Sequence, residues 1–212
     1  MARAAPQVEA PADLVELGRV VSAYGVRGWL KVQPHSPQAD VLLSASRWWL
    51  FPPRRGEGAP SPLDVEASRR QGSSIVAGLA GLADRTAAEA WRGAAVCVPR
   101  SAFPAAREDE YYWVDLIGCL LYGESDGWPA LIGRVAEVLD NGAHALLKVH
   151  RLASRAPEAG AQAPQPGDAA GLEPALDAHG RPREVLVPFV AAHVRGVDLG
   201  ARRIDTSWPA DF

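Results

Sequence analysis

The sequence predicts an all-β protein made of two small β-barrels joined by a linker. Short runs of β-forming residues recur at close intervals and are separated by Gly and Pro, which is typical of small barrels. This pattern breaks once, near residues 99–110. The charge changes there too: up to Ala105 there are 12 Lys and Arg against 9 Asp and Glu, and from Ala106 onward 10 against 16. Net charges of +3 and −6 indicate two domains with different partners, although a drift in surface composition would give the same counts.

The first barrel is expected over residues 13–98, after a disordered, Ala- and Pro-rich tail at 1–12. Its β-like runs are 14–22, 28–33, 47–51, 63–68, 74–82 and 94–98. One short helix interrupts them. Thr86 and Glu89 form a capping-box pattern, and Gly93 can close the helix. A helix of this length is expected to plug an open end of the barrel.

The second barrel is expected over residues 110–212, after a linker at 99–109 that carries Pro and charge. Its β-like runs are 111–122, 131–139, 145–150, 184–190 and 203–206, with Pro188 ending or bending one strand. Between two of these strands, residues 154–183 are rich in Ala, Pro, Gly and Gln and have only two large apolar side chains. That composition predicts a disordered insertion.

Composition narrows the possible functions. An apolar content of 48% supports a real core, and a net charge of −3 lacks the strong basic excess typical of many nucleic-acid-binding proteins. Cys97 and Cys119 each lie in an apolar run, which predicts buried free thiols. The sequence shows no signal-peptide pattern and no apolar run long enough to span a membrane, so we expect a soluble cytoplasmic protein.

The sequence predicts no catalytic residues, no cofactor and no metal site. Residues 123–127 match G-x-S-x-G, but a nucleophile elbow requires a helix after it, whereas another β-like run follows. The same residues suit a hairpin turn. His144 and His150 on one strand would lie roughly 20 Å apart, too far to share a metal. The remaining candidates for function are aromatic side chains that could bind a partner. If Tyr111 and Tyr112 are on a strand, alternation turns at least one of their rings outward.

Four stretches, in order, resemble the RimM family of ribosome-maturation factors, which implies a barrel like the second domain of translation elongation factors, a linker and a PRC-type barrel. They are Gly18–Val32, Asp84–Gly93, Glu110–Gly118, and the segments beginning at Gly133, Val185 and Val197. Two departures concern turn chemistry and surface contacts: Tyr24 replaces the usual His, and Trp29 stands where an acidic residue is common.

The resemblance implies a non-enzymatic factor that assists maturation of the 3′ (head) domain of 16S rRNA. It implies as partners the free small ribosomal subunit and ribosomal protein nineteen of that subunit, and we expect a monomer. The residues expected to bind the ribosome are Tyr111, Tyr112, Trp113 and Asp115, and those that could face rRNA are Arg19, Arg27, Lys31, Arg54 and Arg55. Two alternatives remain open: an rRNA-modifying enzyme using Ser125 or His144, and a PRC-barrel adaptor that docks on a non-ribosomal protein.

Overall fold

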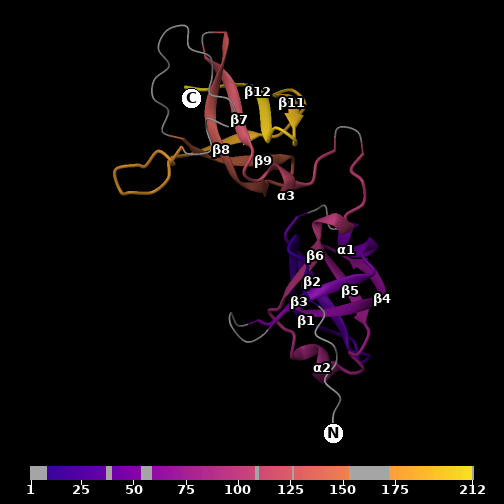
Figure 1. Ribbon diagram of the computed structural model, residues 1–212. Helices are drawn as coiled ribbons and strands as arrows, with labels where there is room; N and C mark the ends of the chain where they lie inside the picture. Colours follow the sequence, from indigo (N-terminus) through magenta and orange to yellow (C-terminus); the bar gives the residue numbers. More distant parts are fainter. Residues whose placement is uncertain are drawn as a thin grey trace. The chain divides into compact units, whose positions relative to one another are not determined.

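The computed structural model describes residues 9–36, 40–53, 59–107, 110–125, 127–152 and 172–211, and its parts are strands with a few short helices. The chain divides into two compact units, Met1–Ala105 and Ala106–Phe212 (Figure 1). The predicted all-β class is confirmed, with one six-stranded sheet in each unit. None of the helices in the described residues has the length and the apolar composition that a membrane-spanning helix requires.

The first unit is a closed six-stranded barrel with the strand order β1-β2-β5-β4-β3-β6 (Figure 1). The strands are β1 (Leu14–Tyr24), β2 (Trp29–Pro34), β3 (Arg47–Phe51), β4 (Ser61–Gln71), β5 (Ser74–Leu79) and β6 (Ala95–Pro99). Alternation sends Leu30 and Val32 of β2 into the barrel, where neither is exposed. Gly18 lets β1 approach β2 closely, because a Cβ there would lie 2.6 Å from the Gln33 carbonyl oxygen.

Strand β3 is buried on both faces. Trp48 is 0% exposed and Trp49 is 3% exposed, although adjacent residues on a strand point in opposite directions. Trp49 packs with Cys97 and Ala95 in a separate cluster, and Ala10 contacts that cluster. Part of the segment expected to be a disordered tail is therefore packed on the barrel, whereas residues 1–8 lie outside the described part of the chain.

The first unit has two short α-helices where the sequence indicated one. Helix α2 spans Arg85–Glu89 and buries Ala88. Its N-cap is Asp84, whose carboxylate accepts a hydrogen bond from the Ala87 N–H at 2.9 Å. The Thr86 capping box is therefore wrong, because Asp84 already occupies the extended cap position and leaves Thr86 inside the helix.

Helix α1, at Asp40–Ser44, buries Val41 and Leu42. Its five residues complete little more than one helical turn, too few to show helical periodicity in the sequence.

The second unit is a six-stranded sheet, with the order β10-β9-β8-β7-β12-β11, around one core. Its strands are β7 (Leu120–Ser125), β8 (Trp128–Asp140), β9 (Ala145–Arg151), β10 (Glu184–Pro188), β11 (Val194–Asp198) and β12 (Arg203–Pro209). The last strand before the C-terminus pairs with the first strand of the unit in parallel, and the remaining pairs are antiparallel. The core includes side chains of β7, β8, β9, β10 and β12, so the sheet curls around it.

The prediction of a strand over 111–122 is wrong in its first half. Helix α3 spans Trp113–Leu116, and β7 begins only at Leu120. Gly118, at φ +81°, turns the chain between them. Helix α3 buries Leu116 completely in the core. This packing outweighs the preference of the neighbouring aromatic residues for a strand.

Residues 172–183 also differ from the expectation of a disordered insertion at 154–183. β-bridges join Leu152 to Pro174 and Leu176 to Pro182. Between them, the Asp177 carboxylate accepts hydrogen bonds from the N–H groups of residues 179 and 181 at 2.7 and 2.9 Å. These bonds hold the pKa of Asp177 below its usual value. A local turn thus orders this segment despite its polar composition, whereas residues 153–171 lie outside the described part of the chain.

Both cysteines are free and buried, which confirms that prediction. Burial raises the pKa of the Cys97 thiol from 9.0 to about 12, and burial also raises the pKa of Cys119. We therefore expect Cys97 to react with a disulfide reagent at pH 8 on the order of a thousandfold more slowly in the native protein than in urea. Modification of Cys97 at the unfolded rate in the native protein would contradict this.

The raised pKa of Cys97 makes the free energy of unfolding depend on pH, and the direction of that dependence follows from the shift. The folded state binds the Cys97 proton more tightly than the unfolded state, because the folded pKa is raised. The contribution to stability is complete below about pH 9 and is lost as the pH rises toward 12.

Candidate binding surfaces

The segment that opens the second unit packs aromatic rings against the core. Tyr111 and Trp113 are partly buried and contact the core cluster, as does Phe189 beyond the end of β10. The Tyr111 and Phe189 rings meet edge to face, with centroids 6.2 Å apart and planes at 77°. This geometry is favourable for aromatic pairs. It fixes the Tyr111 ring on the core while leaving part of it exposed.

Helix α3 is held in place from the β11–β12 hairpin. The Arg202 side chain donates a hydrogen bond from Nη2 to the Ile117 carbonyl oxygen at 2.7 Å. Its guanidinium also lies against Gly118, where an added Cβ would be 2.5 Å from Nη2. The turn after α3 therefore depends on a glycine and on an arginine 85 residues away.

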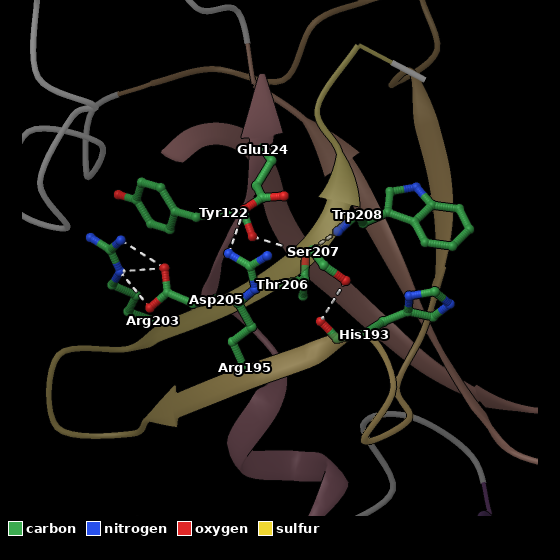
Figure 2. Close-up of polar contacts among 9 residues, drawn as sticks. All are labelled: Tyr122, Glu124, His193, Arg195, Arg203, Asp205, Thr206, Ser207 and Trp208. Carbon is green, nitrogen blue, oxygen red and sulfur yellow. Dashed lines mark hydrogen bonds and ion pairs between the residues drawn. The ribbon is translucent and has the colours of Figure 1, made fainter. Parts of the chain in front are cut away.

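Polar contacts lie along β12 and join the strands β11 and β7 on either side of it (Figure 2). Arg203 donates two hydrogen bonds to Asp205 Oδ1, at 2.7 and 3.0 Å, and its guanidinium lies 4.0 Å from the Tyr122 ring centroid. Arg195 of β11 forms an ion pair with Glu124 of β7. The carboxylates of Glu124 and Asp205 are thus each bound by an arginine, so these contacts stabilise the sheet.

On the other side of the same strand, the His193 and Trp208 rings meet edge to face with centroids 5.2 Å apart (Figure 2). Ser207 donates its backbone N–H and its hydroxyl to the His193 carbonyl oxygen at 2.8 and 3.4 Å. Trp208 is also partly buried against the core. We call the four partly exposed rings on this core the aromatic rim, and they are Tyr111, Trp113, Phe189 and Trp208.

The structure places the predicted ribosome-binding residues in one short segment. Tyr111, Tyr112, Trp113 and Asp115 are all partly exposed and lie in or next to α3. Tyr111 and Tyr112 precede the helix and are not on a strand, so the alternation argument for an outward ring is wrong. Sequence reasoning missed Phe189 and Trp208, because only the fold brings them to the same core as Tyr111.

Three of the predicted rRNA-facing residues are described, and they lie on β1, on β2 and in the turn between these strands. Arg19 forms an ion pair with Glu16 at 3.0 Å, which reduces its available charge. Arg27 is exposed in the turn between β1 and β2, and Lys31 lies on β2. Arg54 and Arg55 lie outside the described residues.

A metal-binding cluster or a nucleophile elbow among the described side chains would indicate an enzyme. Within the described ranges, no group of three or more His, Cys, Asp and Glu could hold a metal ion. The G-x-S-x-G match lies in the β7–β8 hairpin, where strand β8 begins at Trp128, so the strand-to-helix turn of a nucleophile elbow is not formed. Together, these features define a two-domain β protein with partly exposed aromatic and charged surfaces.

Comparisons with known proteins agree with this class. The family model for the RimM N-terminal domain matches residues 15–103, and the model for the RimM PRC barrel domain matches residues 113–212. The chain is 55% identical to the ribosome maturation factor RimM of Bordetella pertussis, with 100% of both chains covered. It is 56% identical to the protein of that name from Bordetella petrii, with 95% of this chain and 96% of the relative covered.

A solution structure of the N-terminal domain of RimM from Thermus thermophilus is 33% identical in sequence. It covers 43% of this chain and 95% of its own, with a TM-score of 0.35. On the two family models and the full-length relatives, the chain belongs to the RimM family of ribosome maturation factors, which confirms the resemblance.

Proposed function

We propose that this protein is a non-enzymatic assembly factor that binds the immature small ribosomal subunit and assists maturation of the 3′ (head) domain of 16S rRNA. The observation that carries the proposal is the match of both units, in order, to the two RimM domain models. Full-length relatives that carry the name ribosome maturation factor support it. The protein would act as a monomer in the cytoplasm.

The second unit is the proposed contact for ribosomal protein nineteen of the small subunit. Its sequence from Ala106 onward has 10 Lys and Arg against 16 Asp and Glu, which complements a basic ribosomal protein. Partly exposed rings of the aromatic rim, next to Tyr112 and Asp115, offer the rigid anchors that dominate protein interfaces. Charge would guide the encounter, and the rings would supply the affinity.

The first unit is the proposed contact for 16S rRNA. Up to Ala105, the sequence has 12 Lys and Arg against 9 Asp and Glu. Exposed Arg27 and partly exposed Lys31 could neutralise rRNA phosphates. Arg19 could do so only partly because of Glu16, and Arg54 and Arg55 remain sequence-based candidates.

Binding of the purified full-length chain to defined partners tests this function. Immobilised protein would be exposed to ribosomal protein nineteen, free small subunits and complete ribosomes. We expect binding to the first two and little to the third. Equal binding to small subunits and complete ribosomes would contradict an assembly role, and failure to bind ribosomal protein nineteen would remove it as the direct partner.

A further inference from the structure

Strands β1, β2, β5 and β4 lie side by side in the first barrel (Figure 1). Side chains that alternate outward from these strands share one surface. Register places Tyr24 opposite Trp29, and Lys31 opposite Val76. Val76 in turn lies opposite Arg69. We call this surface the outer sheet face, and the members that carry the inference are Tyr24, Trp29, Lys31, Gln33, Arg69 and Gln71. The register also places Ser22, Ser74 and Arg19 on this face, and Arg19 is paired with Glu16.

Two aromatic rings lie on the outer sheet face. The Trp29 ring covers Gly78, because a Cβ at that glycine would lie 2.8 Å from the Trp29 Nε1 atom. Tyr24 extends across the sheet and accepts a hydrogen bond on its hydroxyl from Arg69 Nη2 at 3.2 Å. Both rings remain partly exposed, although Val76 beside them is completely buried. The rings therefore rest on the sheet with surface left for a ligand.

Two cations of this face, Arg69 and Lys31, keep their charge available. Arg69 donates to the neutral Gln71 side chain at 3.1 Å, and its guanidinium lies 5.6 Å from the Tyr24 ring centroid. Counting only residues that the structure describes, no carboxylate lies within ion-pair distance of Arg69 or Lys31. Arg70, the next residue on the strand, contrasts with them because it pairs with Asp40 at 2.5 Å.

We propose that the outer sheet face binds a single-stranded RNA segment. Bases would stack on Trp29 and on the stacked pair of Tyr24 and Arg69, and phosphates would contact Lys31 and Arg69. Rings lying on a sheet need unpaired bases, because the bases of a duplex already stack on one another. Carboxamides of Gln33 and Gln71 add hydrogen-bonding groups without negative charge.

This inference deepens the proposed function and rests on it, since the natural RNA would be an unpaired stretch of the immature rRNA.

The test uses the full-length chain and a fluorescent single-stranded RNA of about 12 nucleotides and mixed sequence. Fluorescence anisotropy would give the affinity over a range of salt concentrations. The double variant Lys31→Gln/Arg69→Gln should bind at least about tenfold more weakly, with the salt slope reduced by about 0.7 for each lost phosphate contact. Arg70→Gln removes one positive charge from the strand that carries Arg69 and should leave the slope unchanged.

A second pair of variants tests stacking. Trp29→Ala should weaken binding by about fivefold to a hundredfold, whereas Trp29→Phe should retain most of it. Thermal unfolding would confirm that each variant is folded. Quenching of tryptophan fluorescence by the RNA, lost in Trp29→Phe, would place a base on this ring.

Two results would overturn the inference: no RNA binding by the parent at about 50 mM salt, or equal binding by the parent and Lys31→Gln/Arg69→Gln. If that variant lost small-subunit binding while RNA affinity stayed unchanged, the face would contact a protein, and only the proposed function would stand. If the face bound RNA but the parent ignored small subunits, the proposed function would fall and RNA binding by this face would stand.

Discussion

Changing Tyr111 and Tyr112 together to alanine is expected to weaken binding to small ribosomal subunits by about 2–4 kcal/mol, the range for aromatic interface anchors. The two positions should contribute differently. Tyr111 packs on Phe189 and the core, so Tyr111→Ala should also lower the melting temperature. Tyr112 is partly exposed and is not among the side chains packed against that core, so Tyr112→Ala should lower the melting temperature less than Tyr111→Ala does and should lose binding.

Phenylalanine substitutions are the matched controls for the tyrosine pair. Tyr111→Phe and Tyr112→Phe keep each ring and remove only the hydroxyl group. Both should retain most of the parent's affinity, and thermal unfolding of each variant would show what its hydroxyl group contributes to stability. Co-sedimentation with purified small subunits gives the affinity. If Tyr112→Ala melted normally and co-sedimented like the parent, the segment before α3 would not be the binding site, and the basic residues of the first unit would become the better candidates.

Replacing Trp48 by alanine should lower the free energy of unfolding of the first unit by about 3–5 kcal/mol. Trp48 has no exposed surface, and its Nε1 atom donates a hydrogen bond to the Leu42 carbonyl oxygen at 3.2 Å. The change therefore opens a large cavity and leaves a buried carbonyl without its donor. Urea unfolding, followed with a probe in the first unit, would measure the loss.

Trp128 is the matched control because it is the same residue type with 76% of its surface exposed. Trp128 is in the second unit, so its variant is followed with a probe in that unit, and Trp128→Ala should change the free energy of unfolding there by less than about 0.5 kcal/mol. Similar losses for Trp48→Ala and Trp128→Ala would contradict the assignment of Trp48 to the barrel core.

Local sequence pattern was enough to predict the strands of the first barrel. In β2, apolar Leu30 and Val32 alternate with Trp29 and Lys31, and the predicted run 28–33 agrees closely with the observed Trp29–Pro34. Alternation works here because one face of the strand is buried in the barrel and the other is not.

Long-range contacts decide the features that the sequence did not reveal. Helix α3 depends on Gly118 and on Arg202, which bonds to Ile117 from 85 residues away. No local pattern reports such a contact, and the β-propensity of Tyr111–Trp113 points to a strand. Similarly, Phe189 and Trp208 join the aromatic rim only after the sheet has curled around its core. The order in residues 172–183 comes from β-bridges, one of them to the distant Leu152, and from the Asp177 side chain, which is a weak signal in a polar segment.

The most direct test of the central claim, binding to the immature small subunit, is sedimentation of a cell extract on a sucrose gradient with detection of this protein. The account predicts that the protein migrates with free small subunits and is absent from complete ribosomes. Tyr112→Ala should shift it toward the top of the gradient. If the parent protein remained entirely at the top, or migrated with a complex that contains no small subunit, the account would be contradicted and an adaptor role on a non-ribosomal protein would replace it.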